Sequence, residues 1–337
     1  MTEVNSDAFP SVPRELSQKD ENVLLGDAPP ATALTDISPD ILLDVTWSTR
    51  KSELYAIDSY FREGCWIFAE DIPGMLGVAL CMLKPEAVVG RRLRPALDAL
   101  SAAGFKPLDV IRFRYDRLSI REVYRYQFNR ASPDLIAAMD LVLPSTDSVC
   151  LILRDEHWVP GAPPASVRLN SLKGPSDMAL RRPQHLRYQL GVVNGLLNFI
   201  HVSDELIDVV REIAVLCDVE RQVLTRERIR SDFDAVSETL SVFDDLELMH
   251  PAHDFDHDAS WLRLAGTDGL VGRLARQRAE GMRIPLGQLI PAAREASLQG
   301  SLDWDLLTVL TCALEVMTIP GITPTVPTIT TDWVDSV

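Results

Sequence analysis

The residues best placed to do chemistry in this sequence surround His201. An apolar run ends at Ile200 and a helical pattern begins near Asp204, so we expect His201 at the mouth of a strand-to-helix turn. Asn198 lies three residues before the histidine, and Glu212 lies eleven residues after it. A carboxylate that orients an imidazole ring can hold it as a nucleophile. Taken alone, such a histidine is more often structural, so this interpretation needs a polyphosphate site elsewhere in the chain.

The charge of the chain is distributed unevenly. The net charge of −16 argues against general binding to nucleic acid. Residues 1–75 and 219–337 are each strongly acidic, whereas residues 76–218 carry 18 basic and 16 acidic side chains. Most of these basic side chains are arginines, which suit bidentate contacts with phosphate. A phosphate site is therefore expected in the middle segment, although charge alone also fits a solvated surface.

Composition indicates an ordinary globular protein, with 46% hydrophobic and 24% charged residues among 337. No apolar run reaches the ~18 residues that would suggest a membrane span, and the acidic first residues are unlike a signal peptide. The five cysteines are scattered and form no CxxC pair, which is typical of reduced thiols. We therefore expect a cytoplasmic protein with no membrane partner.

Strand and helix patterns alternate in the middle segment. Four short apolar runs predict strands, at residues 77–83, 107–114, 149–153 and 195–200. Helical spacing predicts four helices, at residues 87–103, 119–128, 134–141 and 204–216. Ser203 is the expected N-cap of the last helix. This order predicts an α+β fold, a ferredoxin-like sandwich of the split βαβ type, over residues 76–218.

The flanks differ from the middle segment. Residues 1–38, rich in Pro, Ser, Asp and Glu, predict a disordered or draped acidic arm, and residues 39–75 predict an ordered N-terminal extension. Amphipathic helical segments then predict a helical C-terminal domain over 219–318. The last segment, 319–337, is proline- and threonine-rich and is expected to be an extended tail.

Several motifs of the middle segment share their order and spacing with one family. They are Leu83-Lys84-Pro85-Glu86, Ala103-Gly104-Phe105, Glu122-Val123-Tyr124, Asn198-Phe199-Ile200-His201-Val202-Ser203-Asp204 and Glu212. In these motifs residues 76–218 resemble the nucleoside diphosphate kinase family. That family shows Lys-Pro-Asp, Gly-Phe, a His-Tyr pair and Asn-x-x-His-Gly-Ser-Asp in the same order.

The resemblance implies a role for each matching residue. His201 would carry the phosphoryl group and Glu212 would orient its ring. Lys84 and Tyr124 would lie beside the histidine and the γ-phosphate. The remaining nucleotide- and phosphate-binding positions would be Arg130, Arg168, Ser176, Arg187 and Asn198.

For function, the resemblance implies ping-pong transfer of the γ-phosphate of ATP or another nucleoside triphosphate. The phosphate would pass through phospho-His201 to a nucleoside diphosphate or a related acceptor, with Mg²⁺ accompanying the nucleotide as cofactor. The implied partners are nucleotides and further copies of the chain in a homo-oligomer. The loop 181–184 replaces a Lys-Pro-Gly segment that the family uses in subunit contacts, so the family's hexamer stays open.

Two departures from the family support an alternative function. Val202 stands where the family has Gly, and a β-branched residue cannot easily adopt the backbone angles open to glycine. Ser132 stands where the family has the aromatic residue that stacks on the base. The alternative is a catalytically weakened nucleotide-binding or regulatory module, in which the helical C-terminal domain does the work.

A second group of polar residues lies at 250–258, with three histidines and three aspartates in nine positions. These residue types could bind a divalent metal, and His253, Asp256 and His257 are the candidate ligands. The spacing matches no standard zinc pattern. A solvated loop between helices is therefore the alternative interpretation.

Overall fold

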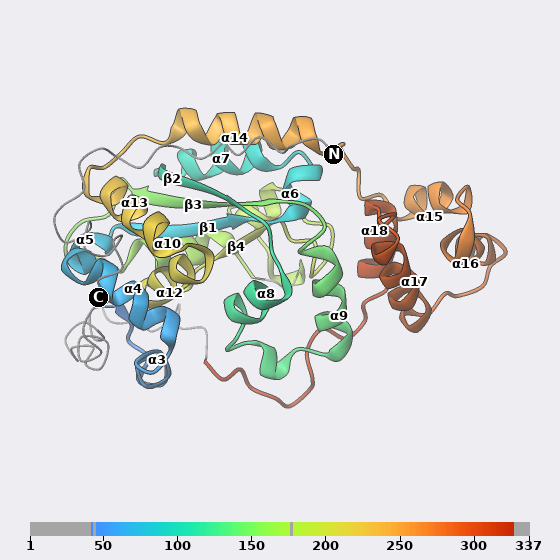
Figure 1. Ribbon diagram of the computed structural model, residues 1–337, viewed down its shortest axis with the longest axis horizontal. Helices are drawn as coiled ribbons and strands as arrows, with labels where there is room; N and C mark the ends of the chain where they lie inside the picture. The colour runs from blue at the N-terminus through green and yellow to red at the C-terminus, as the bar shows by residue number, and fades with distance from the viewer. Residues whose placement is uncertain (1–41, 43–44, 176–177, 327–337) are drawn as a thin grey trace.

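Figure 1 shows a sheet covered by helices, with a lobe of further helices beside it. The computed structural model describes residues 42, 45–175 and 178–326. Three predictions fall outside these residues: the acidic arm over 1–38, the tail beyond 326, and the role of Ser176.

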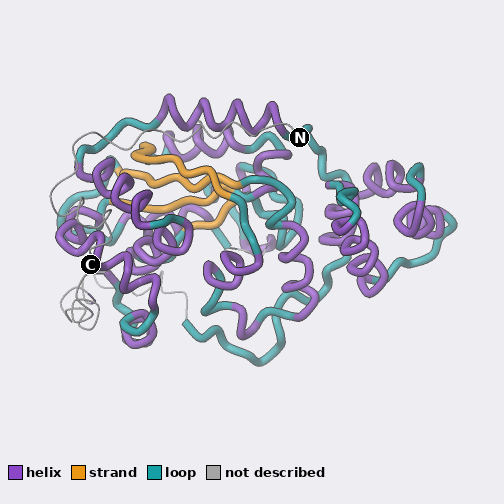
Figure 2. The backbone as a smooth tube through the Cα atoms, viewed as in Figure 1, coloured by secondary structure: helices purple, strands orange, loops and turns teal. Residues whose placement is uncertain are grey.

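Within the described residues, four strands form one sheet in the order β2-β3-β1-β4, and each neighbouring pair is antiparallel. The strands are β1 (Val78–Leu83), β2 (Phe105–Phe113), β3 (Ser148–Asp155) and β4 (Ile200–Val202). Helices cover both faces of the sheet (Figure 2), so every residue of β1 is buried and its apolar run is continuous. The chain is therefore a mixed α+β protein.

The register of the sheet places His201 beside the end of β1. Met82 pairs with His201, and Leu83 pairs with Ile200. Lys84 follows directly after Leu83, so the predicted lysine and histidine come to the same end of two neighbouring strands.

The fourth strand was predicted over 195–200, and this is wrong, because the strand covers only Ile200–Val202. The preceding residues form a loop. The side chain of Asn194 accepts hydrogen bonds from the amides of Leu196 and Leu197, which turns the backbone. Phe199 then adopts a positive φ of 64°, which a regular strand cannot contain.

Helices connect the strands in turn. They are α6 (Pro85–Val89) and α7 (Leu93–Ala102), α8 (Arg117–Val123) and α9 (Pro133–Val142), α10 (Ala165–Lys173) and α11 (Leu186–Gln189), and finally α12 (Leu206–Leu216). The single helix predicted over 87–103 is two helices, because Arg91 adopts a positive φ of 55° between them. The helix predicted over 119–128 ends at Val123 and is followed by a 3-10 turn, η3 (Phe128–Arg130).

The start of α12 also differs from the prediction. The N-cap is Glu205 rather than Ser203, and its side chain forms a capping box with Asp208. The hydroxyl of Ser203 instead donates a 2.6 Å hydrogen bond to Glu212. Ser203 therefore supports the site rather than the helix terminus.

The N-terminal extension consists, where it is described, of α3 (Thr49–Tyr55), α4 (Ser59–Phe68) and α5 (Ile72–Met75). Helix α4 packs against α12. Buried ion pairs join the two parts, with Asp58 on Arg211 at 2.9 Å and Lys51 on Asp208 at 2.6 Å.

The first helices after α12 belong with the sheet. Helices α13 (Val219–Arg230) and α14 (Val236–Met249) pack against β2. Asp109 of β2 accepts hydrogen bonds from Arg221 and Arg228 of α13. The part of the C-terminal region that stands apart in Figure 1 therefore begins only after α14.

The lobe contains α15 (His257–Ala265), α16 (Gly269–Ala279), α17 (Leu286–Leu298) and α18 (Trp304–Cys312). Helices α17 and α18 contact α9, which joins the lobe to the sheet-bearing part. The chain then returns from α18, and Thr318 forms a β-bridge with Ala131. None of the described helices is both long enough and apolar enough to cross a membrane.

Candidate functional site

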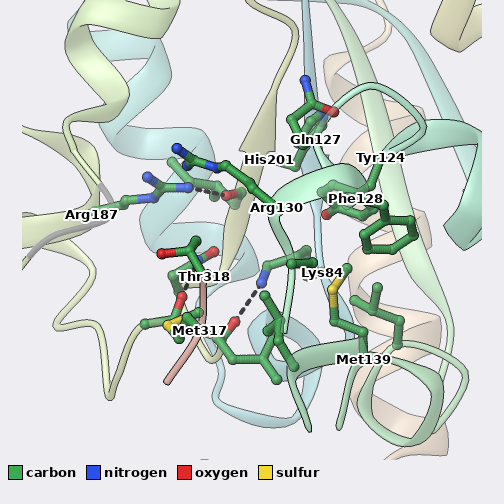
Figure 3. Close-up of a pocket in the computed structure, with 17 residues that line it drawn as sticks. Lys84, Tyr124, Gln127, Phe128, Arg130, Met139, Arg187, His201, Met317 and Thr318 are labelled. Carbon is green, nitrogen blue, oxygen red and sulfur yellow. Dashed lines mark hydrogen bonds between the residues drawn. The ribbon is translucent and has the colours of Figure 1, made fainter. Parts of the chain in front are cut away.

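The candidate site is a cavity of about 450 Å³ at the end of β1 and β4 where Lys84 and His201 meet. Figure 3 shows its lining. Seven of the predicted site residues are near one another here. Six of them line the cavity, namely Lys84, Tyr124, Arg130, Arg187, Asn198 and His201. The seventh, Glu212, lies behind the histidine and contacts it directly.

His201 is held from one side by a buried carboxylate. Its Nε2 lies 2.9 Å from Oε1 of Glu212, and Oε2 of Glu212 accepts the 2.6 Å hydrogen bond from Ser203. The carboxylate accepts, so Nε2 carries the proton and Nδ1 keeps its lone pair. Among the described residues, Nδ1 has no hydrogen-bond partner. The geometry thus presents an oriented imidazole whose second nitrogen has no partner among the described residues.

Tyr124 lies edge-on to the histidine, with ring centroids 5.4 Å apart and planes at 73°. Burial raises the pKa of its phenol well above the usual range. Tyr124 therefore stays neutral at physiological pH, and its hydroxyl remains able to donate a hydrogen bond.

Lys84 reaches the cavity but already has partners. Its Nζ lies 2.7 Å from Oε1 of Glu86 and donates to the carbonyl of Leu196 at 2.7 Å. The side chain is almost fully buried, and burial lowers the pKa of the ammonium against the opposing effect of Glu86. Lys84 and Glu86 together tie α6 to the loop that precedes β4.

Two arginines of the cavity have no carboxylate partner among the residues that the structure describes. Arg187 donates to the carbonyls of Gly174 (3.0 Å) and Ile200 (3.3 Å), while its buried Nε has no partner among the described residues. Burial, with a smaller contribution from Arg181, lowers the pKa of Arg187 to about 10. The guanidinium of Arg130 likewise contacts no acceptor in the part of the chain that the structure describes.

Figure 3 shows the side chains of Arg130 and Arg187 among those that line this end of the cavity. Two cationic side chains that line one cavity, with no carboxylate in its described lining, favour an anion as its occupant. The pair therefore has the chemistry of an anion site. Asn198 completes this end of the cavity, although its amide already donates to the carbonyl of Gly195 at 2.8 Å.

One predicted phosphate ligand among the described residues does not line the cavity. Arg168, which was predicted to contact phosphate, is instead paired with a carboxylate. Its guanidinium binds both carboxylate oxygens of Asp155 at 2.6 Å, lies over the ring of Phe105, and does not line the cavity. These bonds use Nε and Nη2, with Nη2 also donating to the carbonyl of Ala103, and they hold the guanidinium at Asp155. Ser176 lies outside the described residues.

Each of the metal ligands predicted at 250–258 has a structural partner in the lobe. His253 contacts Asp305 at 2.9 Å, Asp256 caps α15, and His257 accepts a 3.1 Å hydrogen bond from Trp261. In the described part of the chain, no three His, Cys, Asp or Glu side chains are grouped so that they could hold a metal ion.

Val202 does not distort the site. It pairs with Cys81 in the regular part of β4, with its side chain buried, so a β-branched residue fits the backbone there. The unusual backbone lies at Phe199 instead, whose positive φ costs about 1–3 kcal/mol for a bulky side chain.

The cavity also contains residues that the sequence reasoning missed. Leu135, Met139 and Leu143 recur every fourth residue along α9, a spacing that could have identified them as one face of a helix. Met317 and Thr318 come from the segment after α18. No signal in the sequence connects that segment to His201.

No protein-family model matches this chain, and no curated protein sequence matches it. Among solved structures, the chain is similar to the Aquifex aeolicus nucleoside diphosphate kinase, with 24% identity and a TM-score of 0.35. The similarity covers 42% of this chain and 94% of that one. At this score the likeness supports no conclusion about activity. The fold and site define a mixed α+β protein with a carboxylate-held histidine in a cationic cavity.

Proposed function

We propose that this protein is a phosphotransferase of the nucleoside diphosphate kinase type. It would move the γ-phosphate of ATP or another nucleoside triphosphate to His201, and from there to a phosphorylated acceptor. The supporting scaffold would be a ferredoxin-like split βαβ sandwich over residues 76–218. One observation carries the proposal: Nδ1 of His201 is free in a cavity whose described lining contains three cationic side chains and no carboxylate.

In the first step, the lone pair of Nδ1 attacks the γ-phosphorus in line with the bond to the leaving oxygen. An N–P bond forms, the P–O bond breaks, and its electron pair leaves with the nucleoside diphosphate. The imidazole ring gains positive charge as the bond forms. The carboxylate of Glu212, 2.9 Å from Nε2, stabilises that charge without leaving its position.

The second step reverses the first on a different molecule. A phosphate oxygen of the acceptor attacks the phosphorus, the N–P bond breaks, and its electron pair returns to Nδ1. Arg130, Arg187 and Lys84 are placed to offset the charge on the transferring group in both steps.

Mg²⁺ would reach this site on the triphosphate rather than on the protein. Protein-bound Mg²⁺ is usually held by one or two carboxylates, and the described lining of the cavity contains none. We therefore assign no magnesium ligand to this chain, and the ion is part of the substrate.

A second candidate function is a nucleotide-binding or regulatory module without turnover. The observation in its favour is the ion pair of Lys84 with Glu86, which leaves the ammonium partly neutralised before any substrate arrives. Such a module would bind anions at Arg130 and Arg187 without forming a phosphohistidine.

Incubation with γ-labelled ATP and Mg²⁺ separates the two functions. Phosphotransfer predicts label on the protein that is labile to acid and stable to base, and that His201→Ala abolishes. His257→Ala is the matched control, because His257 lies in the lobe and does not line the cavity. A wild-type protein that binds ATP in calorimetry but takes no label would contradict phosphotransfer and favour the binding module.

A further inference from the structure

The cavity beside His201 has a second end that is apolar. Leu135, Met139 and Leu143 form a stripe along α9 at this end. Leu196 of the loop before β4 and Met317 of the C-terminal segment face the same space. In Figure 3, Met139 and Met317 lie on one side of Lys84, and His201 and Tyr124 lie on the other.

The C-terminal segment is held firmly as a wall of this apolar end. Ser132 donates from its amide to the carbonyl of Met317 (3.0 Å) and from its hydroxyl to that of Val316 (2.6 Å). The amide of Ile319 donates to the carbonyl of Arg130 at 2.7 Å. The same segment is thus bonded on both sides of Met317, and the wall directly adjoins an arginine of the cationic end.

The loop before β4 packs against Met317 through Gly195. A Cβ atom at Gly195 would lie 2.4 Å from the sulfur of Met317, so a larger residue there would force the methionine side chain to shift. Asn194 of the same loop donates to the hydroxyl of Thr311 in α18 at 3.1 Å. The lobe and its following segment therefore shape the cavity.

The chemistry of the apolar end suits an aliphatic group better than a nucleobase. The side chains of Leu135, Met139, Leu143, Leu196 and Met317 contain no hydrogen-bonding group that could satisfy the polar edge of a base. Burying such an edge without partners is costly, whereas each buried methylene contributes favourably. Ser132, where a stacking aromatic would be expected, instead caps α9 and binds the C-terminal segment.

The aromatic ring that does line the cavity, Phe128, is already in contact with other side chains. The guanidinium of Arg121 lies 5.1 Å from its centroid, and the ring of Tyr124 lies 5.9 Å away. Phe128 therefore adds to the apolar surface rather than standing free as a platform for a base.

We propose that the acceptor is the phosphate ester of an aliphatic alcohol. Its phosphate lies at the cationic end, against Arg130, Arg187 and His201, and its alkyl chain lies between α9 and Met317. This inference rests on the proposed phosphotransfer and specifies its second step. An oxygen of the ester phosphate attacks the phosphohistidine, the N–P bond breaks with its electrons returning to Nδ1, and the product is the alkyl diphosphate.

Calorimetric titration of the full chain tests the apolar end directly. The ligands are inorganic phosphate and methyl, propyl and pentyl phosphate. Each added methylene should tighten Kd about fourfold. Met317→Ser should weaken this dependence on chain length, with the largest loss of affinity for pentyl phosphate. Met317→Leu should restore it. Met282→Ser, a half-exposed methionine of the lobe, is the matched control.

The inference is overturned if Kd does not depend on chain length, if no alkyl phosphate binds, or if ADP binds more tightly than pentyl phosphate. Labelling of His201 by ATP is measured separately. The affinity for alkyl phosphates could depend on chain length while His201 takes no label from ATP. That result would refute phosphotransfer and support the apolar subsite. A labelled protein that ADP discharges faster than pentyl phosphate would refute the subsite and leave phosphotransfer.

Discussion

The backbone amide of Phe199 donates a 3.0 Å hydrogen bond to Oε1 of Glu86, a side chain 113 residues earlier in the chain. The same oxygen lies 2.7 Å from the ammonium of Lys84, and the amide of Lys84 donates to the carbonyl of Phe199 at 2.9 Å. Glu86 thereby holds both the lysine of the site and the strained residue two positions before His201. The carboxylate is fully buried, so its partners must stay together.

Replacing Glu86 should therefore cost much of the stability of the fold. Glu86→Ala leaves the Lys84 ammonium buried without a carboxylate and removes the acceptor of the Phe199 amide. We expect a loss of about 3–5 kcal/mol in the free energy of unfolding, measured by urea denaturation. Glu156→Ala, at an exposed side chain, should change it by less than about 0.5 kcal/mol. Similar losses in both variants would show that Glu86 does not hold the site together.

Glu212→Gln should impair phosphorylation far more than folding. The amide can donate to Nε2 of His201, and this favours the tautomer with the proton on Nδ1, which is then no nucleophile. By analogy with the triad carboxylate, the initial rate of labelling from γ-labelled ATP should fall by about 10³–10⁴. Ser203→Ala leaves the carboxylate charged, so it should reduce the labelling rate much less. Equal labelling rates in wild type and Glu212→Gln would refute this role.

Arg187 and Arg168 should respond differently to the same substitution. Arg187→Gln removes a cation of the cavity, and we expect the labelling rate to fall by about 10²–10³. Arg168→Gln breaks the ion pair with Asp155 away from the cavity, so it should lower the melting temperature and leave the labelling rate unchanged. A large effect of Arg168→Gln on labelling at a temperature where the variant is folded would count against the placement described above.

Stability should fall in acid partly because of Asp58. Burial alone would raise the pKa of this carboxyl, but Arg211, the amide of Phe61 and Tyr126 together lower it below its ordinary value of 3.8. A carboxyl whose pKa is lower in the folded chain contributes stability above its unfolded pKa. That contribution is lost as the pH falls below about 3.8 toward the folded pKa.

The test compares urea unfolding of wild type and Asp58→Asn at pH 7 and pH 3. The variant should be less stable at pH 7 and should lose less stability between the two pH values. Asp98→Asn, at an exposed position of α7, should keep the wild-type difference. If Asp58→Asn loses as much unfolding free energy between pH 7 and pH 3 as the wild type, other carboxylates are responsible for the acid sensitivity.

The strands and the histidine–carboxylate pair could be predicted because they depend on local patterns. Buried strands need continuous apolar runs, and the runs at 77–83, 107–114 and 149–153 all form strands within a residue or two of their predicted bounds. The eleven residues from His201 to Glu212 span a turn and part of one helix, so the two side chains meet through short-range structure.

The choice among the arginines could not be predicted. Arg168 and Arg187 are both basic residues of short helices in the same loop-rich stretch. Arg168 forms an ion pair because β3 places Asp155 next to it in the folded chain. The distance in sequence does not show which arginine lies near that carboxylate. The same holds for His253 and His257, whose partners Asp305 and Trp261 become known only from the packing of the lobe.

The sequence by itself determined the alternation of strands and helices, the order of His201 and Glu212 across a strand and the following helix, and the cationic character of the middle segment. Backbone periodicity and composition are local properties. Only the tertiary structure decided that Lys84 is paired with Glu86, that Arg168 lies outside the cavity, and that Met317 forms one of its walls. Ser132 and Val316, whose hydrogen bond fixes that wall, are 184 residues apart. Contacts of this kind follow from how apolar faces are buried and how charges find partners once the chain has folded, and no periodicity in the sequence encodes them.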